Sequence, residues 1–272
     1  MKPTIVHKTP KTLLNPASGY LTGYSHTLNP YTGCAFSCTY CYVREMPVAK
    51  FRGEPWGTWV DVKEGAASIL AKELVKAKRK GRVTIFMSSS TDPYQPAEYN
   101  ERLTRSLLEA MVAEQPDFLL VQTRSPLVTR DIDLLLRLKD RVRISVTVET
   151  DLEPVRRAFT PAAPPIAARL GALQRLTAAG LDTQAAISPV LPSSQRFAAR
   201  LAEVVGRVCI DDFFMGDGSL GKRTERLGIR RIYEQLGLSD WYDREAYQRV
   251  VAELRHHFPE DRLFISQAGF LP

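Results

Sequence analysis

The chain of 272 residues is long enough for one large α/β domain, and its hydrophobic content of 44% and charged content of 25% are ordinary for a globular protein. It has no run of about 18 apolar residues, and its start, MKPTIVHKTPKTLLNP, lacks the apolar segment of a secretory signal. We therefore expect a cytoplasmic protein without a membrane span, and the net charge of +7 is compatible with an anionic partner such as nucleic acid.

Regularly spaced apolar runs predict a parallel sheet. Strand-like runs begin near residues 83, 118, 142, 183 and 208, and a segment with helical periodicity lies in each interval. Alternating strands and helices indicate βαβ units. The helix-like segment 64–80 needs a strand before it, and residues 23–28 are the candidate. These six or so units, fewer than the eight of a closed barrel, predict an incomplete (β/α)6 TIM-type barrel with parallel strands.

Two segments lie outside this regular pattern. We expect residues 1–21 to form an N-terminal arm, residues 22–216 the barrel, and residues 217–272 a basic, helical C-terminal extension. The extension contains an expected helix over 243–256 and a short last strand at 263–265 that would lie at an edge of the sheet.

Three of the four cysteines, Cys34, Cys38 and Cys41, lie within eight residues directly after the first candidate strand. In a reducing compartment such clustered thiols favour a metal or a cluster over a disulfide. A zinc site usually needs four ligands with C-x2-C pairs, whereas the spacing here is C-x3-C-x2-C with no further Cys or His nearby. Three thiolates on a cubane [4Fe–4S] cluster would leave one iron open. A zinc site completed from afar and three reduced core thiols are the alternatives.

This spacing, with an aromatic residue before the last cysteine, resembles the radical S-adenosylmethionine (SAM) superfamily. TDPYQPAE at 91–98 resembles, more narrowly, the branch related to the DNA-repair enzyme spore photoproduct lyase, and NPYTGC at 29–34 and ISVTVET at 144–150 extend the likeness over about residues 20–215. The resemblance implies an enzyme with a [4Fe–4S] cluster and SAM as cofactors. It would cleave SAM reductively and form a 5′-deoxyadenosyl radical for hydrogen abstraction, with electrons from a donor such as flavodoxin or ferredoxin.

The resemblance also implies roles for residues at the strand ends. The three cysteines would hold the cluster. Short hydrogen-bond acceptors after the second strand would bind the SAM ammonium, and an arginine after the third strand would pair with the SAM carboxylate. A polar face of the fourth strand, which also includes Glu149, would contact the SAM ribose. A segment of the fifth strand would lie along the SAM adenine. A turn, an exposed arginine and plain core packing are the alternatives. The expected SAM contacts are Ser90, Thr91, Asp92, Arg124, Ser145, Thr147 and Ile187.

Two features bear on the reaction. Tyr42 follows the last cluster cysteine, where the lyase has a tyrosine associated with relaying a hydrogen atom, and packing beside the cluster is the alternative. The lyase also carries a hydrogen-donor cysteine near the end of its second barrel strand, but this chain reads MSSST at 87–91 and has no cysteine between Tyr42 and Val208. Cys209, on the sixth strand, is expected to be a buried structural cysteine. The missing thiol weakens the prediction of photoproduct repair.

A basic segment follows the barrel. On one helix Lys222, Arg226 and Arg230 would form a single stripe suited to phosphates, and Tyr233, Trp241 and Tyr242 would offer stacking surfaces. A solvated helix face is the alternative. The sequence thus predicts a radical SAM enzyme, lyase-like in its reaction and with a nucleic-acid substrate as one hypothesis. A radical SAM enzyme acting on a peptide or small metabolite is a second hypothesis, and a non-enzymatic zinc-binding module is a remote third.

Overall fold

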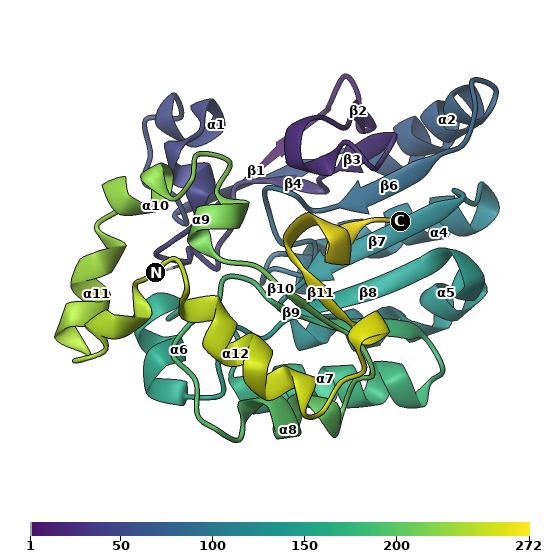
Figure 1. The fold of residues 1–272 in the computed structure, drawn as a ribbon. Coiled ribbons are helices and arrows are strands. Elements are labelled where there is room, and N and C mark those ends of the chain that lie inside the picture. The colour runs from purple at the N-terminus through teal and green to yellow at the C-terminus, as the bar shows by residue number, and fades with distance from the viewer. Residues whose placement is uncertain (1) are drawn as a thin grey trace.

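The protein is built around an open, mostly parallel sheet (Figure 1). The computed structural model describes residues 2–272. The main sheet has eight strands in the order β11-β10-β9-β8-β7-β6-β3-β2, and each neighbouring pair from β3 to β11 is parallel. Because β11 and β2 are its two edges, the sheet does not close on itself. The prediction of an incomplete parallel barrel is confirmed.

The strand positions agree closely with those expected from the apolar runs. The runs near 83, 118, 142, 183 and 208 form β6 to β10, and the expected last strand pairs with β10 as β11. The first strand is shorter than the expected residues 23–28, and β2 (Asn15–Pro16) pairs with it in antiparallel fashion. The parallel strands are β3 (His26–Leu28), β6 (Thr84–Met87), β7 (Phe118–Thr123), β8 (Val142–Thr147), β9 (Asp182–Ile187), β10 (Val208–Ile210) and β11 (Leu263–Ile265).

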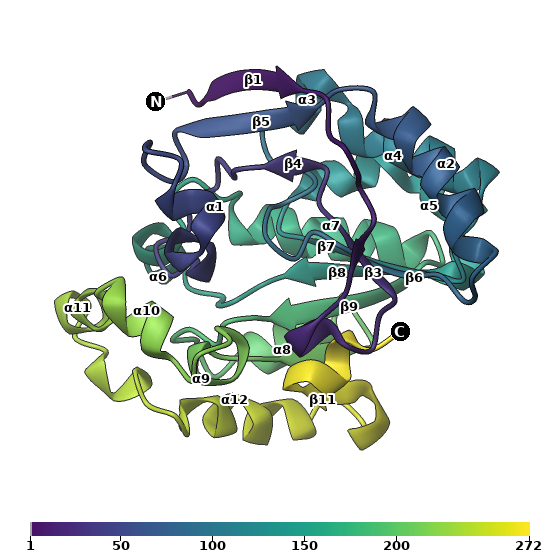
Figure 2. The ribbon, with the colours of Figure 1, turned by 90° about the horizontal axis from the view of Figure 1, so that it is seen from above.

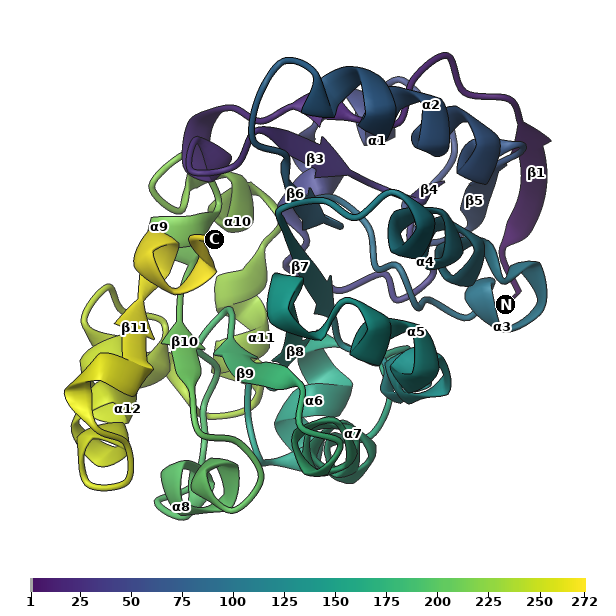
Figure 3. The same ribbon diagram turned by 90° about the vertical axis from the view of Figure 1, so that its right-hand side faces the viewer.

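Helices surround the outer side of the curved sheet (Figure 3). Apolar side chains recur at helical spacing, so each helix buries one face against the strands; in α4, Leu103, Leu107 and Met111 do so. The helices on this side are α2 (Ala66–Lys78), α4 (Leu103–Ala113), α5 (Ile132–Arg137), α7 (Ile166–Ala178) and α8 (Phe197–Ala202), and shorter helices α3 (Glu98–Glu101) and α6 (Glu153–Phe159) lie in the loops.

A second, three-stranded sheet carries the chain into the cysteine loop (residues 34–41). β5 (Trp59–Lys63) lies between β1 (Thr4–Lys8), which is parallel to it, and β4 (Tyr31–Thr32), which is antiparallel. The N-terminal segment therefore supplies strands to both sheets. Between β3 and α2 the chain makes β4, the cysteine loop, α1 (Pro47–Lys50) and β5. β1, β4 and β5 lie outside the alternating pattern of strands and helices, so they were not predicted from the sequence.

The two terminal segments are joined where the main sheet is open. The Tyr24 hydroxyl donates to the Phe270 carbonyl at 2.5 Å, and the Gln267 amide donates to the Tyr20 carbonyl at 2.6 Å. Tyr24 and Phe270 also pack with Phe86 on the inner face of the sheet. Residues near positions 20 and 270 thus act as one structural unit.

α9 (Phe213–Gly216) and the first two helices of the C-terminal extension, α10 (Lys222–Arg226) and α11 (Ile229–Gln235), lie at the end of the sheet to which the strands point (Figures 1 and 2). The last helix of the extension, α12 (Ala246–Arg255), packs beside α8. The expected single helix through Lys222, Arg226 and Arg230 is wrong, because Gly228, with φ of +72°, separates α10 from α11. Within residues 2–272, no helix combines the length and hydropathy that a membrane span requires.

Gly33 sets the course of the chain into the cysteine loop. Its φ is +85°, and a Cβ there would lie 2.5 Å from the Trp59 carbonyl oxygen. We predict that Gly33→Ala lowers the free energy of unfolding by about 2–4 kcal/mol, from backbone strain and steric overlap together. Gly53→Ala is the matched control: Gly53 has φ of +77° but open space around it, so we expect a loss of only about 1 kcal/mol. Equal losses in denaturant unfolding would contradict close packing at Gly33.

Candidate active site

The cysteine loop opens into a cavity of about 630 Å³ at the carboxyl ends of the strands. Cys34, Cys38 and Cys41 all line this cavity, and all three are free thiols. Side chains from outside the loop fix its backbone. The Gln95 amide group binds both the Ala35 amide, at 2.8 Å, and the Gly33 carbonyl, at 3.1 Å. The loop is therefore held in shape before any ligand binds.

A second clamp holds the middle of the cysteine loop. The Arg44 guanidinium donates to the Ser37 carbonyl at 2.8 Å and to the Cys38 carbonyl at 3.0 Å. On the other side, the Thr39 amide and hydroxyl both donate to the Phe159 carbonyl at 2.9 Å. Because the contacts are made to the backbone, the cysteine side chains stay free to act as ligands.

The donor set suits a cluster better than a single ion. Burial, followed by Asp92 and the other two thiols, raises the pKa of Cys34, and burial raises that of Cys41 to about 11. Thiolates at these positions therefore need a positively charged partner. No three His, Cys, Asp or Glu side chains in the described chain are placed to share one metal ion. On a cubane each thiolate binds a different iron, so its sulfur ligands stand farther apart than those around zinc.

Polar atoms without partners face the same cavity. The Ser88 and Thr91 hydroxyls and the Gln122 side-chain oxygen are buried, and none has a hydrogen-bond partner within residues 2–272. Such atoms cost free energy unless a ligand or water satisfies them. The residues at the ends of β6 and β7 thus fit a polar cofactor. Thr91 was predicted; Ser88 and Gln122 were not, although both lie in the polar stretches that end those strands.

The Asp92 carboxylate, an expected SAM contact, is bound by donors from the chain. It lines the cavity, but one carboxylate oxygen accepts from the Tyr94 amide at 2.9 Å and the Thr123 hydroxyl at 2.6 Å, and the other accepts from the Arg124 amide at 2.8 Å. Burial raises its pKa, and these donors oppose that shift. Asp92 therefore ties the end of β6 to the end of β7. Ser90, beside it, lines the cavity, and its amide donates to the Asn29 side chain at 3.0 Å.

Arg124 belongs to a buried charge network behind the cysteine loop. Its guanidinium donates to Glu149 at 2.6 Å and to the Tyr40 hydroxyl at 2.9 Å. The other Glu149 oxygen accepts from the fully buried Arg169, and Tyr40 donates to Glu149 at 2.6 Å. Burial would raise the pKa of Glu149, but Arg169 and Arg124 together lower it to about 2. Two cations and one anion leave a positive excess beside Cys38, which suits a thiolate or a carboxylate ligand.

The remaining expected SAM contacts divide between the cavity and the core. Thr147 lines the cavity, and its hydroxyl accepts from Gln122 at 2.7 Å. Ser145 is fully buried deeper in the sheet, where it accepts from Gln184 at 3.0 Å. The Ile187 side chain is fully buried in the core, although the next two residues, 188 and 189, line the cavity. Only Thr147 of these three side chains reaches the site.

Tyr42 and Cys209 also occupy distinct environments. Tyr42 lines the cavity, and its hydroxyl donates to the Ser89 carbonyl at 2.6 Å, which joins the cysteine loop to the end of β6. Burial raises its pKa. Cys209 is fully buried on the inner face of β10, outside the residues that line the cavity, and its thiol donates to the Ser266 carbonyl at 3.5 Å. This is the setting of a structural cysteine.

Residues far from the cysteines complete the cavity. We call them the distal wall: residues 18–21, 211–213 and 216–218, Arg223 and Phe270. They come from the two terminal segments, the end of β10 and the start of the extension. Sequence reasoning did not find them, because loops brought together by the fold share no local pattern.

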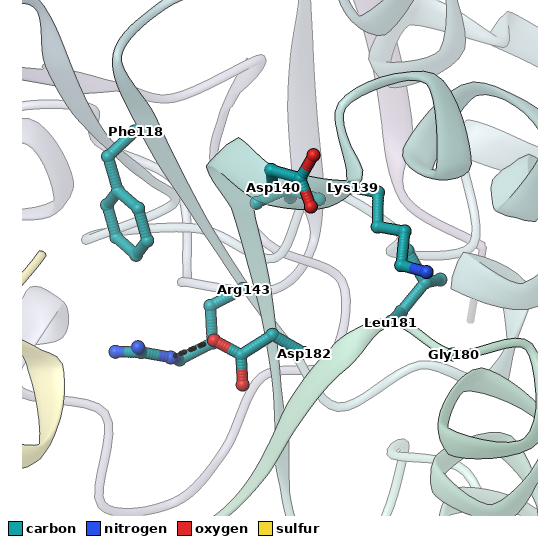
Figure 4. Close-up of a pocket in the computed structure, with 8 residues that line it drawn as sticks. Phe118, Lys139, Asp140, Arg143, Gly180, Leu181 and Asp182 are labelled. Atoms are coloured by element: carbon teal, nitrogen blue, oxygen red, sulfur yellow. Dashed lines mark hydrogen bonds and ion pairs between the residues drawn. The ribbon is translucent and has the colours of Figure 1, made fainter.

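A second pocket of about 460 Å³ lies at the amino ends of β7 to β9 (Figure 4). Its main cation is paired: Arg143 donates to Asp182 at 2.8 Å and to the Leu271 carbonyl at 3.2 Å, and it lies over the Phe118 ring. In barrels of this kind the amino ends of the strands carry stability, and the carboxyl ends carry the chemistry. The cysteine-lined cavity is therefore the candidate site.

Comparison with known proteins places this site in a family. Residues 28–194 match the model of the radical SAM superfamily. The chain belongs to this superfamily and is an enzyme of the radical SAM type, as the cysteine spacing predicted. The family implies a [4Fe–4S] cluster and SAM, in keeping with the donor set of the cavity.

Sequence relatives carry no assigned function. The chain is 32% identical to an uncharacterized protein of Methanocaldococcus jannaschii over 66% of this chain and 64% of that protein. It is 30% identical to an uncharacterized protein of Mycobacterium tuberculosis over 68% and 55%, and 33% identical to one of Acidianus two-tailed virus over 62% and 56%. The matches thus span only 55–64% of the length of these relatives.

Solved structures show the same fold. A variant of spore photoproduct lyase with bound AdoMet and dinucleoside spore photoproduct has a TM-score of 0.66 at 16% identity, over 97% of this chain and 82% of that one. SuiB of Streptococcus suis bound to S-adenosylmethionine has a TM-score of 0.52 at 11% identity, over 97% and 47%. At these identities the likeness concerns architecture.

The Glu149 network predicts an acid-sensitive contribution to stability. The pKa of Glu149 in the folded protein lies below its ordinary value of 4.5. Its contribution is therefore complete above pH 4.5 and is lost as the pH falls towards 2. Glu149→Gln should lower the free energy of unfolding by about 3–5 kcal/mol at pH 7, since two buried arginines lose their counter-ion.

The difference between wild type and Glu149→Gln should shrink below pH 4.5 in denaturant unfolding. Glu203, which is exposed on the surface, provides the control: Glu203→Gln should change stability by less than about 0.5 kcal/mol at either pH. A penalty for Glu149→Gln that stays constant from pH 7 to pH 3 would show that the network is not ionised as described.

Proposed function

We propose that Cys34, Cys38 and Cys41 hold a [4Fe–4S] cluster and that SAM binds beside it at the ends of β6, β7 and β8. One observation carries the proposal: three free thiols line a single cavity together with buried polar atoms that have no partner in the described chain. A cluster with three thiolate ligands supplies an open iron for the amino and carboxylate groups of SAM and the electron that cleaves its sulfonium to a 5′-deoxyadenosyl radical.

The residues of the chain would position SAM and keep water away from it. The Ser88 and Thr91 hydroxyls and the Gln122 oxygen can accept from an ammonium or from ribose hydroxyls. Arg124 is held in place by Glu149 and adds positive charge for a carboxylate. Tyr42 is fixed by Ser89, so we assign it a positioning role at the junction of the cofactor and the substrate space. Electrons would come from a small donor protein such as flavodoxin or ferredoxin.

The reaction is proposed as hydrogen abstraction from a substrate carbon. Among the described residues that line the cavity, the only thiols are those of the three proposed ligands. A serine hydroxyl, as in residues 88–90, holds its hydrogen much more strongly than a thiol does. The described residues that line the cavity therefore offer no further thiol that would return hydrogen to a repaired thymine.

A nucleic acid is the substrate class we propose. Four exposed cations, on α10 and α11, follow directly after the distal wall: Lys222, Arg226, Arg230 and Arg231. In the part of the chain that the structure describes, Arg226 alone among them has a carboxylate partner, Glu45 at 3.7 Å. The other three have no carboxylate partner there, and a group of exposed cations suits a polyanion.

The aromatic residues of the extension do not contribute as expected. Tyr233 and Tyr242 are only 1% and 7% exposed, because they pack with Phe159 and Phe213 in the core below the extension. Trp241 is partly buried and lies under Arg249. The prediction that Tyr233 and Tyr242 offer stacking surfaces is wrong, and the basic residues alone support nucleic-acid binding at this surface.

The ligand assignment predicts the metal content of the anaerobically purified protein. Wild type should contain about four iron and four sulfide per chain. Cys34→Ala, Cys38→Ala or Cys41→Ala should each reduce both to below about one and lower 5′-deoxyadenosine formation more than about 100-fold. Cys209→Ala, which changes the thiol outside the cavity, should keep the cluster. Bound zinc without sulfide would contradict the proposal and favour a zinc-binding module.

The substrate class predicts a salt-dependent affinity. Replacing Lys222, Arg226, Arg230 and Arg231 with alanine should weaken binding of a single-stranded oligonucleotide and reduce the slope of log K against log salt by about 0.7 per lost phosphate contact. A matched control variant has four other exposed cations, on α2 and in the turn before β6, replaced with alanine: Lys72, Lys76, Arg79 and Lys80. This variant should keep the wild-type slope. A wild-type protein that binds no oligonucleotide at low salt would favour a peptide or small metabolite.

A further inference from the structure

One carboxyl group of the cavity has a buried oxygen without a partner in the described chain. Four aspartates line the cavity. The oxygens of Asp92 are occupied as described above. Asp212 accepts from the Phe214 and Met215 amides, both at 2.8 Å, and so begins α9. Asp217 accepts from the Ser219 amide at 2.7 Å and from the Gly221 and Arg223 amides at 3.0 Å. Asp211 remains.

Asp211 is buried with an unused oxygen. It is 4% exposed and follows the end of β10, and its Oδ1 has no partner within residues 2–272. Its Oδ2 has only a long contact, with the Tyr20 hydroxyl at 3.4 Å, and that hydroxyl is also 3.2 Å from the Ser266 hydroxyl. A Cβ at Gly216 would overlap the carboxyl group, so the start of the extension packs directly on it. A buried acceptor held this firmly needs a donor from outside the chain.

The surroundings of Asp211 suit a flat ring. Besides the carboxyl, aromatic rings from separate parts of the chain line the cavity: Tyr20, Tyr42, Phe86, Phe213 and Phe270. In the sheet, β7, β8 and β9 lie between β10 and β6. Asp211 follows β10, whereas the residues proposed to hold SAM follow β6, β7 and β8. The two sides share one space, since Asp211 is among the groups that raise the pKa of Tyr42.

The charge state of Asp211 supports an uncharged partner. Burial, and then the neighbouring charge of Asp212, raise its pKa to about 7. The charge of Asp211 in turn raises the pKa of three other groups, which are Tyr20, Cys209 and Tyr42. At neutral pH much of the carboxyl is therefore protonated. The protonated carboxyl can donate to a C=O and accept from an N–H on the edge of an uncharged ring. This exchange leaves no buried charge uncompensated.

We propose that Asp211 is a substrate-binding residue, and that its free Oδ1 accepts a hydrogen bond from a ring N–H of a planar base that lies between the aromatic side chains of the distal wall and the cysteine loop. This inference rests on the proposed function and deepens it, because it states what part of a nucleic acid enters the cavity. The basic residues of α10 and α11 would hold phosphates outside, and Asp211 would select a base with an N–H donor inside.

The test uses the reconstituted protein with SAM and two fluorescent probes, a short oligothymidylate and the same oligomer methylated at every N3. The probes differ only at N3, where a methyl group replaces the hydrogen. By fluorescence anisotropy at one salt concentration, wild type should bind the unmethylated probe about tenfold more tightly. Asp211→Ala should bind both about equally, whereas Asp211→Asn, which keeps an acceptor oxygen, should retain at least part of the preference. Circular dichroism spectra and the iron and sulfide content of both variants report on their folding and cluster loading.

Each outcome separates the two proposals. If wild type binds the two probes equally, or if Asp211→Ala keeps the preference, Asp211 does not read an N–H, while nucleic-acid binding still stands. If wild type binds neither probe at low salt, the nucleic-acid assignment fails and this inference fails with it. The probe comparison on wild type alone remains decisive if Asp211→Ala does not fold.

Discussion

The arrangement of the site depends on one buried carboxylate. Glu149, at the end of the fourth barrel strand, accepts from Arg169 of α7, from Arg124 after β7 and from Tyr40 of the cysteine loop. Three elements that are distant in sequence are therefore fixed relative to one another through a single charged group. Since breaking a buried ion pair is costly, the loop cannot move away from the strand ends without leaving charges uncompensated. The cysteines are held ready by electrostatics as well as by backbone hydrogen bonds.

The sequence predicted well what depends on local patterns. Apolar runs located the starts of β6 to β11 to within a residue or so, because buried parallel strands are nearly continuous in hydrophobicity. The spacing of Cys34, Cys38 and Cys41 was enough for the superfamily, since it encodes a ligand geometry directly. The small sheet of β1, β4 and β5 was missed, because its strands lie outside the alternating pattern of strands and helices and pair with segments distant in sequence.

The site was predicted in part, for a related reason. Thr91, Arg124 and Thr147 were found because they lie at strand ends, where the order of the sheet brings them together. Asp92 was found, but its partners were not foreseen: a carboxylate in a turn gives no sign of how many amides will surround it. Asp211 was overlooked because two of its neighbours, Tyr20 and Ser266, come from the distant terminal segments. Long-range packing of this kind has no signature in a single sequence.

The junction of the terminal segments has a consequence for how such enzymes diversify. A patch of residues from the two terminal segments fills the gap left by the open sheet, and its hydrogen bonds join one segment to the other. The patch contains Tyr20, Tyr24, Gln267 and Phe270. Exchanging those two short stretches together would reshape the chamber opposite the thiols and leave the strands that carry the cofactor residues untouched. One scaffold can in this way acquire new substrates by changing the junction of its terminal segments while the cofactor site stays the same.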